Sequence, residues 1–265
     1  GLTYVAGQIG MEPSTLELAA GIEAQSLRAA QHAVSVSLIA GAPLDARAIS
    51  VTVYSNVKDI EEKTNALIVA RDALDALFSP SARAFSWKPL RVYIRAGDLP
   101  KRASCEILPV MIDGNGPCGD TNDDDDDDDD DACNVFSQTR AGERQSSDAT
   151  ESASVYRASK FMRCVVAART PDDDGVVEMF ESIIHRLDEA GLTVRDLAHC
   201  RMYRVAKTSA RAPEKLFNAL LSAARESAGI DAPFLIDSIP VHACGLDADV
   251  TADVVLEAYA VAQRV

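Results

Sequence analysis

The sequence predicts an α+β protein of two domains, in each of which a mainly antiparallel sheet is covered on one face by two helices. Its length of 265 residues exceeds what one hydrophobic core usually needs. Segments with the two-residue period of strands alternate with segments that have the 3.6-residue period of helices. This order occurs twice, on either side of a strongly acidic segment, and each occurrence predicts one α+β sandwich.

The first half opens with residues 2–9, where β-branched and aromatic residues predict a strand, and a shorter strand is expected to end at Leu18. Residues 21–40 then predict a helix, because apolar residues recur three or four positions apart. These residues are Leu27, Ala30, Val34 and Leu38. Gly41 follows at the position where the end of a helix favours a left-handed residue.

The rest of the first half predicts a second helix between strands. Residues 48–54 alternate as a strand does, and Asn56 can cap the helix that follows. The apolar face of that helix is expected to comprise Ile60, Leu67, Leu74 and Leu77. Two more strands are predicted at residues 90–96 and 103–112.

The second half repeats this order of elements. Strands are predicted at residues 160–168, 197–205, 234–240 and 250–262, and helices at 176–190 and 213–228. Local matches support a duplication, because Ala190-Gly191 follows Ala40-Gly41 at an offset of 150 residues and Asn218 follows Asn65 at an offset of 153. Little room remains before the first helix for an opening hairpin, so we expect this half to be trimmed there.

The acidity of the chain is concentrated in one segment. The formal net charge is -15, and residues 113–153 hold fourteen acidic and two basic residues, a net of -12. This segment has almost no apolar periodicity, so we expect a disordered, solvated linker. The predicted domains are therefore residues 1–112 and 154–265.

Several classes of protein are disfavoured by composition and motifs. The six cysteines show neither zinc spacing nor a C-x-x-C pair, which favours reduced thiols, a cytoplasmic protein and no metal site. No apolar run is long enough to span a membrane, and an acidic chain is a poor nucleic-acid ligand. Residues 114–119 match G-x-G-x-x-G, but an Asp run replaces the helix N-terminus that would bind phosphate. No cofactor is predicted. The start inside a predicted strand suggests a fragment of a longer protein.

Short motifs in the first half resemble the Rid/YjgF superfamily, which is also labelled endoribonuclease L-PSP or reactive imine/enamine deaminase. They are Ala6-Gly7-Gln8-Ile9-Gly10, Asn65, Leu99-Pro100-Lys101 and Cys105-Glu106-Ile107. The resemblance covers nearly all of residues 2–112 and, more weakly, 158–262. It implies two chorismate-mutase-like domains that assemble as a trimeric or pseudo-trimeric barrel, with ligand sites between subunits.

The resemblance also implies site residues. Arg91 would bind the substrate carboxylate and Glu106 would position water, because a guanidinium grips a carboxylate through two hydrogen bonds and a carboxylate can relay a proton. Counting from Asn65 favours Arg83 as the carboxylate-binding arginine instead. The other predicted ligand-binding residues are Gly7, Gln8, Asn65 and Tyr93. In the second half the arginine and glutamate positions fall on Leu235 and Val255, so that site is expected to be degenerate.

Residues 4–10 and 98–103 look particularly like the first Rid domain of eukaryotic diphthine–ammonia ligases. That resemblance implies the C-terminal part of a ligase that amidates diphthine on elongation factor 2, with its ATP-binding domain upstream. Three hypotheses about the chain itself stay open: an imine or enamine deaminase, a non-catalytic module that binds a metabolite, and a purely structural assembly module. The expected partners are a small carboxylate- or imine-bearing molecule and further copies of the chain.

Overall fold

The computed structural model describes residues 2–44, 48–56, 65–82, 89–112, 140–141, 149–156, 161–168, 173–205, 208, 211–228, 235–250 and 252–261. The chain forms two compact units, which are described separately below. Unit 1 comprises residues 1–122 and 247–250, and unit 2 comprises residues 123–246 and 251–265.

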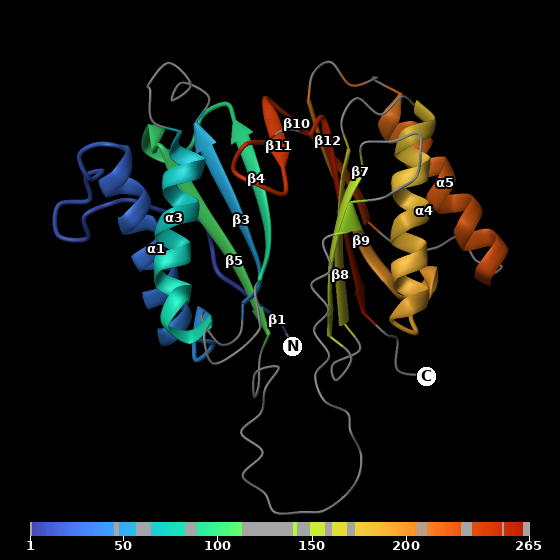
Figure 1. Cartoon of the computed structure of the whole chain (residues 1–265), viewed down its shortest axis with the longest axis horizontal. Helices are drawn as coiled ribbons and strands as arrows, with labels where there is room; N and C mark the ends of the chain where they lie inside the picture. The colour runs from blue at the N-terminus through green and yellow to red at the C-terminus, as the bar shows by residue number, and fades with distance from the viewer. Residues whose placement is uncertain are drawn as a thin grey trace, which may run out of the picture. The chain divides into compact units, whose positions relative to one another are not determined.

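Unit 1 is a sheet with both of its described α-helices on the same face (Figure 1), and a short 3-10 helix (Pro100–Arg102) precedes its last strand. Its elements are β1 (Leu2–Tyr4), β2 (Gln8–Ile9), α1 (Ile22–Ile39), β3 (Ala48–Asn56), α3 (Ala66–Ala82), β4 (Leu90–Ala96) and β5 (Cys105–Ile112). The strand order is β1-β5-β3-β4, and β2 also pairs with β5. Strands β3 and β4 are parallel, and the other pairs are antiparallel. The α+β class and the mainly antiparallel sheet therefore agree with the sequence prediction.

The single strand expected at residues 2–9 is two short strands. Tyr4 pairs with Val110 and Gln8 with Ile107, so three residues on this side face two on β5. This bulge includes Gly7, where the backbone approaches the Glu106 side chain. The short strand expected to end at Leu18 is reduced to an isolated bridge between Met11 and Leu18.

Helix α1, predicted at residues 21–40, buries mainly small residues. Its buried positions keep helical spacing and are Ile22, Ser26, Ala29, Ala30, Ala33 and Ser37. Of the apolar residues whose spacing predicted the helix, Ala30 is buried, whereas Leu27 and Leu38 are 46% and 63% exposed. Alanine and serine allow the helix backbone to lie close to the sheet. This close packing is favoured over burial of the larger leucine side chains. Gly41 has φ +75° and ends the helix, as predicted.

Helix α3 is described from Ala66, and its cap is Asn65, because Asn65 Oδ1 accepts the Leu67 N–H at 3.0 Å. Asn56, predicted to cap this helix, is the buried last residue of β3, and its N–H donates to the Ser104 carbonyl at 3.1 Å. Residues 57–64, which an Asn56 cap would precede, lie outside the described residues. Leu67 and Leu74 are buried as predicted, whereas Ile60 lies outside the described residues.

Unit 2 has the same strand order over four strands. Its elements are β6 (Arg140–Ala141), β7 (Ala149–Tyr156), β8 (Phe161–Ala168), α4 (Asp173–Glu189), β9 (Leu197–Val205), α5 (Ala212–Ala228), β10 (Leu235–Val241), β11 (Ala243–Gly245) and β12 (Val254–Val261). The sheet order is β10-β9-β12-β8-β7-β6. The pair β9–β10 is parallel, like β3–β4, and the other pairs along this order are antiparallel.

Three features of unit 2 differ from the sequence prediction. Strand β7 pairs with β8 along its whole length, so an opening hairpin is present and residues 149–153, expected in the linker, belong to a strand. Backbone pairing forms this strand although its composition is polar. The last strand begins at Val254, because Val250 has φ +46° in a turn. Asn218 lies inside α5, so it does not correspond to the capping residue Asn65.

The helix-free face of the unit 2 sheet carries a charged network. Core residues such as Met162, Cys164 and Leu256 face the other way, and Arg163 and Glu257 form a buried ion pair. The Arg163 guanidinium lies 5.0 Å from the Tyr259 ring centroid, and that ring stacks on His199 at 5.8 Å. Removing one member of a buried ion pair is strongly destabilising, because the other charge stays buried without compensation.

We therefore predict that Glu257→Gln lowers the free energy of unfolding by about 3–5 kcal/mol, because it leaves the Arg163 charge buried without its counterion. Urea unfolding followed by circular dichroism measures this change. Asp237→Asn is the matched control, because Asp237 pairs with Arg201 where both side chains are about one third exposed, and it should cost about 1 kcal/mol or less. Equal costs for the two variants would contradict the prediction.

Candidate functional site

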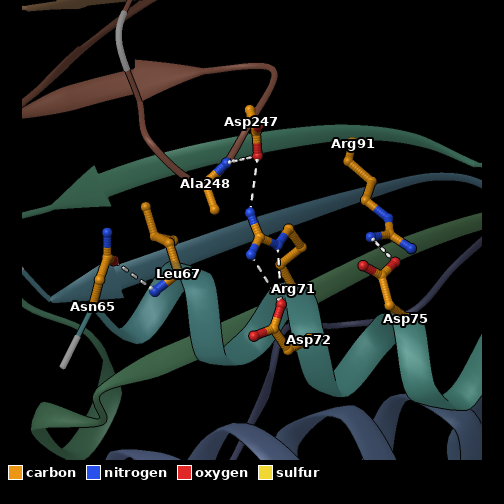
Figure 2. Close-up of polar contacts among 8 residues, drawn as sticks. All are labelled: Asn65, Leu67, Arg71, Asp72, Asp75, Arg91, Asp247 and Ala248. Atoms are coloured by element: carbon orange, nitrogen blue, oxygen red, sulfur yellow. Dashed lines mark hydrogen bonds and ion pairs between the residues drawn. The ribbon is translucent and has the colours of Figure 1, made fainter.

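Arg91 is held on the helix-covered face of unit 1 by a residue of α3. Arg91 pairs with Val51 of β3, and its Nη1 donates to Asp75 Oδ1 at 2.6 Å (Figure 2). The Arg91 side chain is 16% exposed, whereas that of Asp75 is 57% exposed. The cation is therefore enclosed and the anion is open to solvent.

Tyr93 provides a second contact for the same guanidinium. It lies two residues further along β4, so it points to the same face, and it is 2% exposed. Burial raises the pKa of Tyr93, and the nearby Arg91 only partly offsets this, so the hydroxyl stays protonated. Burial alone would lower the pKa of Arg91, but Tyr93 and Asp75 outweigh it and leave the pKa above its ordinary value. Arg91 is therefore a fixed and permanently charged group.

A second arginine near Arg91, Arg71 of α3, also forms ion pairs. Arg71 donates to Asp72 Oδ1 through Nη2 at 3.0 Å, and its Nη1 lies 3.5 Å from Asp247 of the 247–250 segment of unit 1 (Figure 2). Asn65, expected to bind ligand, uses its side-chain oxygen to cap the helix. Sequence reasoning missed both Arg71 and Asp75. Their four-residue spacing on one helix face was the available signal.

Glu106 lies on the opposite, helix-free face of the sheet. Its neighbour Cys105 points to α1, because Cys105 Sγ donates to Ser26 Oγ at 3.4 Å, and side chains alternate along a strand. A Cβ on Gly7 would overlap the Glu106 carboxylate, so the two residues are in close contact. Burial raises the pKa of the Glu106 carboxyl above its ordinary value. Gln8 Nε2 donates to the Ala6 carbonyl at 2.8 Å, which supports the same loop.

The structure thus brings the predicted residues together in two groups rather than one. Glu106 pairs with Tyr54, and Tyr54 pairs with Ile94, three residues beyond Arg91. Two strand spacings and three residues place the Cα atoms of Arg91 and Glu106 roughly 14 Å apart. Because their side chains leave opposite faces, Arg91 and Glu106 of the same unit 1 do not converge on one small ligand.

The remaining predicted positions add little to either group. Arg83 lies outside the described residues. In unit 2, Val255 pairs with Tyr203 as Glu106 pairs with Tyr54. By the same register, Ile236 and not Leu235 stands at the position of Arg91. Ile236 and Leu235 are both apolar, so on either alignment the described part of unit 2 has no arginine at the position of Arg91.

Among the residues that the structure describes, no three His, Cys, Asp or Glu side chains are grouped so that they could hold a metal ion. No described helix combines the length and apolar character needed to cross a membrane.

Comparisons with known proteins give matches only among solved structures. No protein-family model and no curated protein matches the chain. The YjgF gene product of E. coli is 20% identical, with 43% of this chain and 81% of that chain covered at a TM-score of 0.35. E. coli TdcF with bound serine is 19% identical, with 43% and 81% covered at 0.36. RidA from an Antarctic Psychrobacter is 23% identical, with 42% and 79% covered at 0.34. The matched structures thus include Rid/YjgF proteins, and each similarity spans less than half of this chain.

The two glycines of the first motif predict different effects of the same substitution. Gly7→Ala should displace the flexible end of Glu106 and cost about 1 kcal/mol of stability, whereas any activity that needs Glu106 should be lost. A Cβ on Gly10 meets the backbone of Gln25 in α1, which cannot swing aside, so Gly10→Ala should cost about 3 kcal/mol. Thermal or urea unfolding of both variants checks this ranking, and the reverse ranking would contradict it.

Proposed function

We propose that unit 1 is a Rid-type module that binds the carboxylate of a small imine- or enamine-bearing molecule through Arg91. The observation that carries the proposal is the environment of this guanidinium, which is enclosed and held by Tyr93 on β4 and by Asp75 on α3. A planar guanidinium that does not move recognises a carboxylate with little loss of conformational entropy. The spacing from Arg91 through Leu99-Pro100 to Glu106, which resembles the Rid family, supports the same role.

The proposed chemistry is hydrolysis of the carbon–nitrogen double bond. Water adds to the carbon while Glu106 accepts a proton from it and returns that proton to the nitrogen. The carbon–nitrogen bond then breaks, so one water and one imine become a carbonyl compound and ammonia. The raised pKa of Glu106 brings this carboxyl closer to neutral pH, where general acid–base groups work best.

The separation of Arg91 from Glu106 supports a site that is completed by self-association. In this proposal Arg91 of one copy of the chain faces Glu106 of another copy, in a closed, trimer-like ring of identical head-to-tail contacts. This is the arrangement that the resemblance to Rid proteins implies. It also explains how residues on opposite faces of one sheet can serve one reaction.

We propose further that the chain is the C-terminal region of a diphthine–ammonia ligase-type protein. One supporting observation is the resemblance of residues 4–10 and 98–103 to such proteins. The other is that unit 2 has apolar residues at the positions that correspond to Arg91 and Glu106. In that setting the ATP-dependent step belongs to another domain. Unit 1 would then bind its ligand with or without turnover.

Mixing two inactive variants tests the shared site. Arg91→Ala and Glu106→Gln should each lower ammonia release from a 2-aminoacrylate-derived imine, the latter about 100-fold. After subunit exchange in a 1:1 mixture, about a quarter of the sites would have both intact residues, so about a quarter of the wild-type rate should return. The control mixture is Arg91→Ala with the double variant Arg91→Ala/Glu106→Gln, which should regain nothing.

The possible outcomes separate the candidate functions. Verified subunit exchange without recovery would contradict a site shared between copies. Wild-type rates in Arg91→Ala would overturn its role in binding substrate. If the wild type releases no ammonia but binds pyruvate only when Arg91 is present, the binding module without turnover is the correct reading.

A further inference from the structure

Asp75 already holds the guanidinium that the proposed ligand needs. We propose that Asp75 is an internal competitor for carboxylates at Arg91 and that it sets which of them bind. This inference rests on the proposed carboxylate-binding role of Arg91. It concerns a residue of α3 that is outside every motif of the sequence.

The two partners of this ion pair differ in how firmly they are held. Arg91 is 16% exposed and also contacts the buried Tyr93, so the guanidinium stays in place when its anion leaves. The Asp75 carboxylate is 57% exposed, so it can turn into water without losing hydration. A ligand carboxylate can therefore replace Asp75 while the charge on Arg91 remains balanced.

Another Arg–Asp pair in the chain shows what a firmer pair looks like. Asp237 accepts three hydrogen bonds of 3.0–3.1 Å from Nε and Nη2 of Arg201, and the two carboxylate oxygens share them. For Asp75 a single oxygen accepts one hydrogen bond of 2.6 Å from Arg91. The contact of Arg201 with both oxygens of Asp237 restricts that guanidinium. The contact of Arg91 with one oxygen of Asp75 suits an anion that a ligand can replace.

The surrounding charges predict which carboxylates are favoured. The described charged residues along this edge of α3 are Arg71, Asp72, Asp75, Arg91 and Asp247, three acids and two bases. When a ligand displaces Asp75, the free carboxylate stays near it. A second negative charge on the ligand is then repelled, so monocarboxylates should bind better than dicarboxylates.

The test is Asp75→Asn in the full chain. The control is Asp72→Asn, which changes the net charge by the same amount three residues earlier on α3. Calorimetric titration at fixed ionic strength uses pyruvate and malonate as probes. Pyruvate should bind about two- to fivefold more tightly to Asp75→Asn, the gain expected from removing one exposed ion-pair partner. The affinity of Asp75→Asn for malonate should rise by at least twice the factor found for pyruvate. Asp72→Asn should change the affinity for either probe by less than about half the factor found for pyruvate with Asp75→Asn.

Further measurements separate this inference from the proposed function. Unchanged or weaker pyruvate binding by Asp75→Asn, in a protein whose wild type loses binding on Arg91→Ala, would overturn the role of Asp75 alone. Pyruvate binding that is absent in wild type and in Asp75→Asn, or unaffected by Arg91→Ala, would overturn the proposed function and this role with it. The double variant Asp75→Asn/Arg91→Ala should show no gain over Arg91→Ala, and a gain there would also contradict competition at Arg91. Thermal unfolding midpoints confirm that each variant is folded.

Discussion

In unit 1 the helices cover one face of the sheet and leave the other face free of helices. This arrangement decides what each strand residue can contact. Side chains alternate along a strand, so each residue faces either α1 and α3 or the helix-free side. Arg91 and Tyr93 point towards the helices, and Asp75 meets them there. Glu106 points away and packs against Gly7. The position of the helices therefore separates Arg91 from Glu106, the two groups of the proposed site, within one copy.

Small residues make this covering possible. Ala29, Ala30 and Ala33 on α1 are fully buried, so the helix backbone can lie close to the sheet. The same closeness requires Gly10, where any side chain would meet the first turn of α1. In unit 2 the core contains larger groups such as Phe180 and Met202, and charged residues occupy its helix-free face. The two sheets thus share a strand order while the residues on their faces differ in chemistry.

The sequence predicted the parts of this structure that depend on local physics. Gly41 and Gly191 adopt the left-handed conformation at helix ends, and Leu67 is buried as its spacing indicated. Periodicity predicted the helix that contains Leu27, but it did not reveal that small residues face the sheet while Leu27 is exposed. The ion pair of Asp75 with Arg91 joins a helix to a strand and leaves no local pattern. The opposite orientations of Arg91 and Glu106 likewise required the register of three strands.

We propose Arg91 as the carboxylate-binding group of this chain. NMR of arginine Nε–Hε groups during a pyruvate titration tests this role most directly, with the Arg91 signal assigned from Arg91→Lys. We expect the Arg91 signal to shift and saturate, while the signal of Arg201, held through two nitrogens by Asp237, stays unchanged. A stationary Arg91 signal at pyruvate concentrations that saturate another arginine would contradict the account.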